Sequence, residues 1–235
     1  ETLGAIRVSM SLGFEVKTKP WIPVERILEN AEDRMYRQKL LESKSLRSSV
    51  IQSMKRTLFE KSNETEEHGE RLKIWCRAVG QQLALPDMEI YELELLALLH
   101  DIGKVAIADR ILKKPGALDA REWEEMRRHP EIGYRIAQSA PELALIAELI
   151  LSHHERYDGT GYPRGIAGEE IPLLSRILAV IDAYDAMTSN RTYREAMKPE
   201  EAARELSRHA GTQFDPEVVR VFLELVLNGP DTNLP

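Results

Sequence analysis

A histidine and an aspartate stand side by side at the end of a strongly apolar helical run. Residues 95 to 99 read Leu-Leu-Ala-Leu-Leu, His100 and Asp101 follow, and Gly103 precedes Lys104. Imidazole and carboxylate groups are rarely buried unless they are paired or bind a metal. Because neighbouring side chains on a helix point about 100° apart, we expect these two residues to serve two adjacent metal centres.

The other histidines favour this interpretation over an ordinary hydrogen-bonded polar pair. Five of the six histidines lie at predicted helix ends or beside acidic residues, whereas His209 is typical of a helix C-terminus; the five are His68, His100, His129, His153 and His154. Imidazole and carboxylate ligands without a thiolate suit iron, manganese or zinc acting as a Lewis acid. Side chains from four separate helices can converge inside a helical bundle, which is where helical proteins build di-metal sites.

Helices must position these residues, and the spacing of apolar residues predicts them. A helix is predicted from about residue 63 to 85, and a further helix after Pro86 leads to His100. Residues 107 to 112 are predicted to be extended or a short turn. Asp119 and Glu122 form a capping-box pattern, which opens a helix toward His129.

Prolines mark the remaining helix starts. Pro141 is predicted to open the helix that delivers His153 and His154, and Pro172 to start a long helix carrying Asp182 and Asp185. Two more helices are predicted to begin at Pro199 and Pro216. The Gly- and Pro-rich stretch from 157 to 165 is predicted to be a loop, either a plain surface turn or part of the site.

Composition places the chain among ordinary globular proteins of the mainly α class. Hydrophobic residues make up 43% and charged residues 30% of the 235 positions, and the net charge is −7. This acidity argues against a partner that is a nucleic-acid polymer. Cys76 is the only cysteine and is expected to be a buried apolar residue. No run of about 18 apolar residues occurs, so we expect a cytoplasmic protein, or the cytoplasmic part of a longer signalling protein.

Several separated motifs occur in one order between residues 61 and 225. They are Glu64 to His68, the His-Asp-Ile-Gly-Lys run at 100–104, His129-Pro130, the run from His153 to Pro163, Asp182 within 176–188, and Phe214-Asp215-Pro216. Together they resemble the HD-GYP family of bacterial cyclic di-GMP phosphodiesterases. The resemblance implies an HD-domain-like helical bundle with a metal site in its core.

The resemblance also implies roles for individual residues. Asp101 would bridge two metals, and Glu64 matches a position that adds a third metal in some members, so two or three divalent ions are expected, iron or manganese rather than zinc. Asp101 and Lys104 are the predicted catalytic residues. The full set of implied metal ligands is Glu64, His68, His100, Asp101, His129, His153, His154 and Asp182. The predicted substrate-binding residues are Lys104, Tyr162, Pro163, Asp185, Arg191 and Arg194.

The implied activity is hydrolysis of cyclic di-GMP to pGpG by metal-activated hydroxide, and whether hydrolysis continues to GMP is left open. Lys104 or a metal-held water would protonate the leaving group. Two alternatives stay open, namely a cyclic di-GMP receptor or docking module with little turnover, and a phosphodiesterase acting on hybrid cyclic GMP-AMP. A GGDEF-domain partner is also compatible with the resemblance.

The N-terminal part has a different pattern. Residues 3 to 18 alternate in polarity as a strand does, and the run 31–39 resembles the C-terminal end of a GGDEF diguanylate cyclase domain whose signature loop is absent here, so no cyclase activity is expected. The predicted organisation is a GGDEF-like remnant at 1–40, a linker helix at 41–60 that could form a homodimer, the HD-GYP domain at 61–228 and a flexible tail at 229–235.

Overall fold

A computed structural model describes residues 23–24, 26–28, 49, 51–62, 65–141, 143–189 and 196–228. The chain divides into two compact units, Glu1–Ser53 and Met54–Pro235. The predicted N-terminal strand, the GGDEF-like run at 31–39 and the tail from 229 onward lie outside the described residues. Of the predicted linker helix, residues 51 to 60 are described and are helical.

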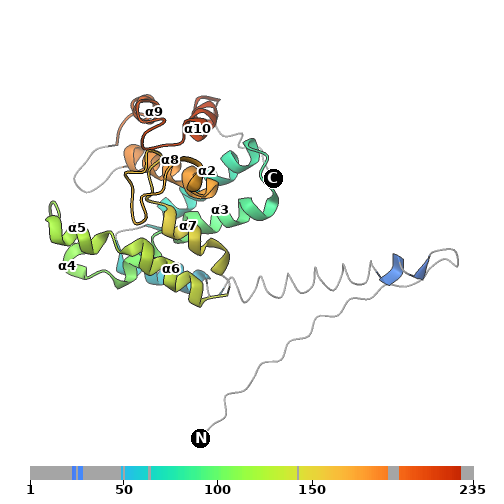
Figure 1. Ribbon diagram of the computed structural model, residues 1–235, viewed down its shortest axis with the longest axis horizontal. Coiled ribbons are helices and arrows are strands. Elements are labelled where there is room, and N and C mark those ends of the chain that lie inside the picture. The colour runs from blue at the N-terminus through green and yellow to red at the C-terminus, as the bar shows by residue number, and fades with distance from the viewer. Residues whose placement is uncertain are drawn as a thin grey trace, which may run out of the picture. The chain divides into compact units, whose positions relative to one another are not determined.

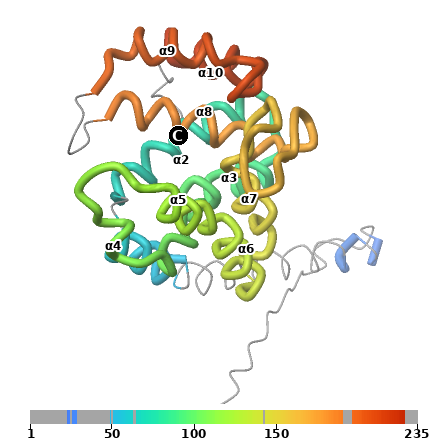
Figure 2. Tube along the Cα trace, turned by 60° about the vertical axis from the view of Figure 1, so that its left-hand side comes forward, coloured from blue at the N-terminus to red at the C-terminus, as the bar shows by residue number. Residues whose placement is uncertain are grey.

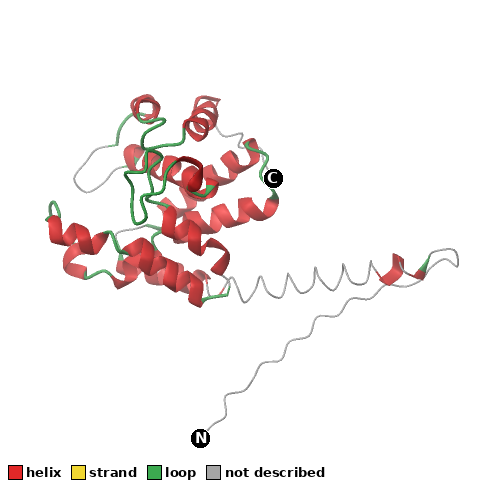
Figure 3. Cartoon of the chain, in the orientation of Figure 1, coloured by secondary structure: helices red, strands yellow, loops and turns green. Residues whose placement is uncertain are grey.

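The described part of the second unit is built from helices joined by loops, with a single isolated bridge between Ala210 and Phe214 (Figures 1 and 3). The prediction of a mainly helical bundle is confirmed. After the helical residues 54–61, the elements in chain order are α2 (Glu66–Gln82), α3 (Asp87–Leu99), the 3-10 helix η1 (Ile102–Ala106), α4 (Asp109–Leu112), α5 (Ala120–Met126), α6 (His129–Ser139), η2 (Ala144–Ile146), α7 (Ala147–Ser152), η3 (Gly168–Glu170), α8 (Leu173–Thr188), α9 (Pro199–Arg208) and α10 (Pro216–Asn228).

The helices α2, α3 and α8 form the centre of the bundle and contact one another (Figure 2). Their facing sides are apolar, and the side chains there are almost fully buried; they include Leu72, Cys76, Val79, Leu93, Leu96, Ile177 and Val180. Burying each large aliphatic side chain contributes roughly 1.5–3 kcal/mol. This core therefore fixes three helices that position candidate ligands: His68 lies in the first turn of α2, His100 at the C-cap of α3, and Asp182 in the second half of α8.

A second group of elements, η1, α6 and α7, packs beside α3. The closest approach is between η1 and α6, where Gly103 faces the backbone of His129 and Gly133. A β-carbon at Gly103 would lie 1.9 Å from the carbonyl oxygen of His129. Glycine at 103 is therefore what allows α6 to begin next to Asp101.

Most of the predicted helix starts are confirmed. Asp119 caps α5 in a capping box with Glu122, and α9 and α10 begin at Pro199 and Pro216. Pro172 is the N-cap of α8. No helix among the described residues combines the length and the apolar character needed to cross a membrane.

Two local predictions were wrong. Pro141 does not open a helix: it lies in a turn, and the chain becomes helical only at η2 and α7. Residues 109 to 112 form the short helix α4, because the carbonyls of Ala108 and Asp109 accept hydrogen bonds from the backbone of residues 111 to 113.

Candidate metal centre

The structure brings seven of the eight predicted ligands into two adjacent groups. In one group the possible ligand atoms of Asp101, His129, His153 and His154 lie within 4.8 Å of one another; in the other, those of His68, His100 and Asp182 do. These residues come from α2, the turn after α3, the start of α6, the end of α7, and α8. The resemblance implies the same division, with His68, His100 and Asp182 at one end of the cluster and His129, His153 and His154 at the other.

Asp101 stands between the two groups. Its Oδ2 lies 3.2 Å from Nε2 of His100, and its Oδ1 lies 3.0 Å from Nε2 of His129. Each oxygen of one carboxylate therefore faces a different group, which is the geometry that a bridging ligand needs. The sequence argument placed His100 and Asp101 at two adjacent centres, and the carboxylate in fact faces both.

The backbone fixes the orientation of three imidazoles. Nδ1 of His100, His129 and His153 lies 3.2, 2.8 and 2.6 Å, respectively, from the carbonyl oxygen three residues earlier in the chain. A carbonyl can only accept, so Nδ1 must donate, and Nε2 of each neutral ring is left with a lone pair. Burial lowers the pKa of His153, and it lowers the pKa of His154 well below its usual value, which keeps both rings neutral.

The donor set fits divalent metal ions. Nε2 of His129 lies 3.3 Å from Nε2 of His153, so two lone pairs face each other at the distance of a hydrogen bond. Oδ1 of Asp101 is buried and accepts no hydrogen bond from any described residue. Lone pairs directed at one another in a buried space are unfavourable unless a cation lies among them. The residues of this cluster thus suit a hard or borderline divalent ion bound by nitrogen and oxygen.

Lys104 supplies a positive charge at the same place. Its Nζ donates to Oδ2 of Asp101 over 2.7 Å, from the first turn of η1. Burial alone would raise the pKa of Asp101, but Lys104 and His100 hold it well below its usual value. Asp101 is therefore an ionised carboxylate, as a bridging ligand must be.

His68 is oriented by a carboxylate instead of a backbone carbonyl. Its Nδ1 lies 2.7 Å from Oδ2 of Asp185, and its Nε2 lies 3.5 Å from Oδ1 of Asp182. Arg71, one turn further along α2, donates to both oxygens of Asp185 over 2.6 and 2.8 Å. Burial would raise the pKa of Asp185, but Arg71 and His68 hold it well below its usual value. An ionised Asp185 fixes the tautomer of His68, the arrangement common around metal-bound histidines.

The loop after His154 folds back onto that residue. The ring of Tyr162 stacks on the ring of His154 with centroids 4.9 Å apart, and the backbone N–H of Tyr162 donates to the carbonyl of His154. Pro163 follows Tyr162 and is half-buried. Tyr162 therefore lies directly beside the metal group that contains His154.

Gly159 and Gly161 in this loop are required by the path of its own backbone. Gly159 has φ +78°, which favours glycine. A β-carbon at Gly161 would lie 2.3 Å from the backbone nitrogen of Arg156, so the close approach at Gly161 is between two parts of this loop. Both glycines are therefore explained by the conformation and packing of the loop itself.

Three predicted site residues, Glu64, Arg191 and Arg194, lie outside the described residues. Two residues at the site were missed by the sequence argument: Arg71, which holds Asp185, and Arg127, which contacts Tyr162. Arg71 stands three positions after His68, which places both on one face of α2 and was a usable signal. Arg127 gave no such signal, because its contact depends on how α5 sits beside the loop.

Comparisons with known proteins agree with this arrangement. The HD domain family matches residues 52–218. The chain belongs to the HD domain family. A protein of Thermotoga maritima named cyclic di-GMP phosphodiesterase is 44% identical over 164 residues, which cover 69% of this chain and 45% of the relative. A Vibrio cholerae protein named 3'3'-cGAMP-specific phosphodiesterase 2 is 36% identical over 177 residues, covering 74% of this chain and 34% of the relative.

The solved structures show the same fold. A Vibrio cholerae protein described as a cyclic GMP-AMP specific phosphodiesterase superposes with a TM-score of 0.61 at 24% identity, covering 77% of this chain and 49% of the other. The chain spans less than half the length of the curated relatives above. The HD domain is thus the part that the relatives share with this chain.

Proposed function

We propose that this HD domain is a metal-dependent phosphodiesterase that hydrolyses cyclic di-GMP. The observation that carries the proposal is the convergence of five imidazoles and two carboxylates on two adjacent groups with Asp101 between them. The relative of Thermotoga maritima that carries the name cyclic di-GMP phosphodiesterase is 44% identical over the aligned residues. The same motifs resemble the HD-GYP family, which is the finer assignment that we propose.

Seven described residues would hold the metals. His68, His100 and Asp182 would hold one ion, His129, His153 and His154 another, and Asp101 would belong to both. Such ions supply an acidified water as nucleophile and withdraw charge from a phosphate. Nitrogen and oxygen ligands without a thiolate suit iron, manganese or zinc, and the resemblance to the HD-GYP family favours iron or manganese among them. Glu64, which would add a third ion, lies outside the described residues, so the count of two or three remains part of the proposal.

Side chains around the cluster would neutralise charge, donate a proton and orient a ligand. Lys104 lies against Asp101 and is placed to neutralise charge on a phosphate oxygen beside the ligands. An ammonium at that position can also protonate the departing ribose oxygen and take up a proton from solvent afterwards. Asp185 holds His68 in the tautomer that presents Nε2. It is 5% exposed and already engaged by Arg71, so we assign it a positioning role in place of substrate binding.

Tyr162 and the predicted cationic residues would bind the substrate. The ring of Tyr162 covers His154 and offers a surface beside the reacting phosphate. Pro163, Arg191 and Arg194 complete the substrate-binding residues that the resemblance implies. A cyclic dinucleotide is an anion, and an overall net charge of −7 makes these local cations necessary.

The test begins with the protein purified without added metal. Bound iron, manganese and zinc are measured, and hydrolysis of cyclic di-GMP is assayed before and after reduction, with separation of pGpG and GMP. We expect hydrolysis that depends on bound iron or manganese and is lost in Asp101→Ala. Metal-loaded protein that binds cyclic di-GMP without cleaving it would identify a receptor and refute the enzymatic proposal.

Hybrid cyclic GMP-AMP is the second candidate substrate. A relative that is 36% identical is named as specific for 3'3'-cGAMP. Rates with cyclic di-GMP and with the hybrid cyclic GMP-AMP, measured on one metal-loaded preparation, separate the two. Our proposal requires that cyclic di-GMP has the larger kcat/KM.

The remaining assignments concern the parts around the HD domain. The division at residues 40, 60 and 228, the GGDEF-like remnant, a GGDEF-domain partner and a homodimer through the linker helix stay predictions. Size-exclusion chromatography with light scattering on the full chain and on a chain that begins at residue 54 tests the homodimer.

A further inference from the structure

Arg127 is an exposed cation beside the candidate metal centre that the assignments above do not use. It follows the last residue of α5, and its guanidinium carbon lies 5.3 Å from the centre of the Tyr162 ring. That ring stacks on His154, whose imidazole belongs to the group around Asp101. Arg127 is therefore one aromatic ring away from a candidate metal ligand.

The charge of Arg127 is not neutralised by the described part of the chain. Other charged residues of this region form ion pairs: Glu122 accepts from Lys114 over 2.5 Å, and Glu125 accepts from Arg110 over 2.9 Å. No carboxylate among the described residues lies within ion-pair distance of Arg127, and its guanidinium makes no hydrogen bond to them. A cation held on an aromatic face keeps its N–H groups available for an anion.

The phenol of Tyr162 is partly buried and lies near charged residues of other elements. Burial, together with the negative charge of Asp101, raises the pKa of Tyr162, while the nearby charges of Lys104 and Arg127 oppose that rise. Two cations on different elements thus border the candidate site: Lys104 of η1 contacts Asp101, and Arg127 at the end of α5 contacts the ring of Tyr162.

We propose that Arg127 is a substrate-binding residue that contacts a phosphate of the cyclic dinucleotide, and this inference rests on the proposed function. A cyclic dinucleotide carries two phosphodiester groups, and only one of them can occupy the metal centre at a time. The other needs a cation outside the ligand cluster. A guanidinium binds phosphate oxygens in pairs, which also orients the ring of the substrate.

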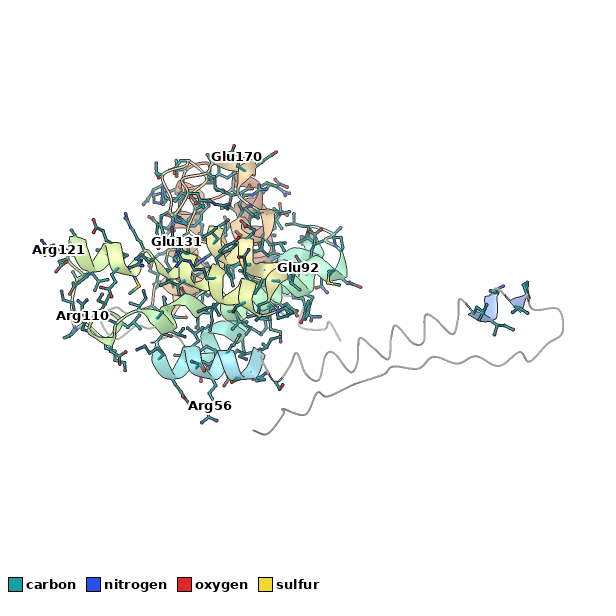
Figure 4. The ribbon with its side chains drawn as sticks, turned by 60° about the horizontal axis from the view of Figure 1, so that its bottom comes forward. Arg56, Glu92, Arg110, Arg121, Glu131 and Glu170 are labelled. Atoms are coloured by element: carbon teal, nitrogen blue, oxygen red, sulfur yellow. The ribbon has the colours of Figure 1, made fainter. Side chains whose placement is uncertain are left out.

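The test compares Arg127→Ala and Arg127→Lys with Arg121→Ala. Arg121 is the matched control because it lies on the same helix, is exposed, carries the same charge and stands at the outer end of α5, away from the body of the bundle (Figure 4). In hydrolysis of cyclic di-GMP, Arg127→Ala is expected to raise KM about tenfold with kcat within about twofold, the loss of one charge-assisted hydrogen bond at a partly solvated site. Arg127→Lys should recover most of that loss, and Arg121→Ala should match the wild-type protein. Adding salt should raise KM more steeply for the wild-type protein than for Arg127→Ala.

Several outcomes would overturn the inference. The inference fails if KM is the same for Arg127→Ala and Arg121→Ala. It also fails if kcat falls and KM does not change, because Arg127 would then only hold Tyr162 in place. Circular dichroism and bound-metal analysis establish that each variant is folded and loaded. If the wild-type protein binds cyclic di-GMP without turning it over, the proposed function fails, and calorimetric Kd values of the same variants decide the inference separately. If it neither binds nor hydrolyses cyclic di-GMP, both fail.

Discussion

Replacing Gly103 by alanine should damage the metal centre without touching a ligand. A β-carbon there would lie 1.9 Å from the carbonyl oxygen of His129 and 2.6 Å from the backbone nitrogen of Gly133, whereas ordinary contact begins at 3.4 Å. The difference between 1.9 and 3.4 Å means that the start of α6 must retreat by about 1.5 Å. Both obstructing atoms belong to the backbone, so no side-chain rotation relieves the clash. Because α6 begins with His129, the retreat carries this imidazole away from Asp101.

The expected magnitudes follow from that displacement. Metal–ligand distances tolerate only about 0.2 Å of variation, so a shift of this size removes His129 from the ligand set. Overpacking of a core typically costs about 1–3 kcal/mol of unfolding free energy. A misplacement near 1 Å at a reacting centre lowers rates by about 100-fold. We therefore expect Gly103→Ala to lose bound metal, to be less stable by about 1–3 kcal/mol and to hydrolyse cyclic di-GMP at least about 100-fold more slowly.

The assay combines metal analysis, urea unfolding and steady-state hydrolysis on the same preparations. Gly80→Ala is the matched control, because it makes the same chemical change inside α2 and its β-carbon would meet only side-chain atoms, the nearest being Cγ1 of Ile90 at 3.0 Å. This control should keep the metal content and activity of the wild-type protein. If Gly103→Ala keeps both as well, the close approach of α6 is not what places His129 beside Asp101.

Three further predictions use other parts of the structure. Asp185→Asn leaves Nδ1 of His68 without its anionic partner and should weaken metal binding by roughly 10–100-fold in a chelator competition, an effect that a substrate-binding role alone would not produce. Burial raises the pKa of Cys76, so iodoacetamide should label it at pH 8 only after unfolding, and unfolding free energy should fall as pH rises above the unfolded thiol pKa of about 8.5; labelling of the native protein would contradict this. Removing metal with a chelator should lower the melting temperature, and adding manganese should restore it, with no response in Asp101→Ala, because ligands that converge only in the folded state couple binding to stability.

Much of the helical framework was predictable because its signals are local. The capping box at Asp119 and the prolines at 199 and 216 act through the first helical turn alone, and the structure places helix starts at all three. The apolar side of α2 was also predictable, since Leu72, Cys76 and Val79 recur at helical spacing and are fully buried. These features need no knowledge of the neighbouring elements.

The local errors came from segments whose conformation is set by tertiary contacts. Pro141 carries a helix-start signal, but the chain around it remains a turn: Ala140 is extended, its carbonyl is bonded by Leu143 and Ala144, and Leu143 is completely buried. Burial of Leu143 and Ile146 against the neighbouring helices α3 and α6 thus accompanies the delayed helix start. A single sequence does not contain that information.

The types of the candidate ligands were predictable, whereas the groups that orient them were not. Imidazoles and carboxylates at helix ends stand out in a sequence because burial without a partner is unfavourable. The partners themselves lie on other elements: Asp185 reaches His68 from α8, and Arg127 reaches Tyr162 from α5. These contacts depend on how the helices pack, so the spacing of residues along the chain does not predict them.

One rule of helix chemistry nevertheless connects the sequence to the orientation of three imidazoles. The last carbonyls of a helix have no partner within the helix. His100 and His153 are the C-caps of α3 and α7, and their Nδ1 atoms donate to the carbonyls of Ala97 and Ile150. At His129 the reason is a missing donor. The carbonyl of Met126 would normally accept from the backbone N–H of residue 130, but that residue is Pro130, which has none. Nδ1 of His129 donates to this carbonyl instead.

The same bond therefore does two things at each position. It satisfies a carbonyl that the end of the helix leaves open, and it fixes the tautomer whose Nε2 lone pair faces Asp101 and its neighbours. Helix termination and ligand orientation are thus one structural event in this HD domain. At His100, His129 and His153, the carbonyl that a helix end leaves open thus selects Nε2 as the nitrogen that the histidine offers to a metal.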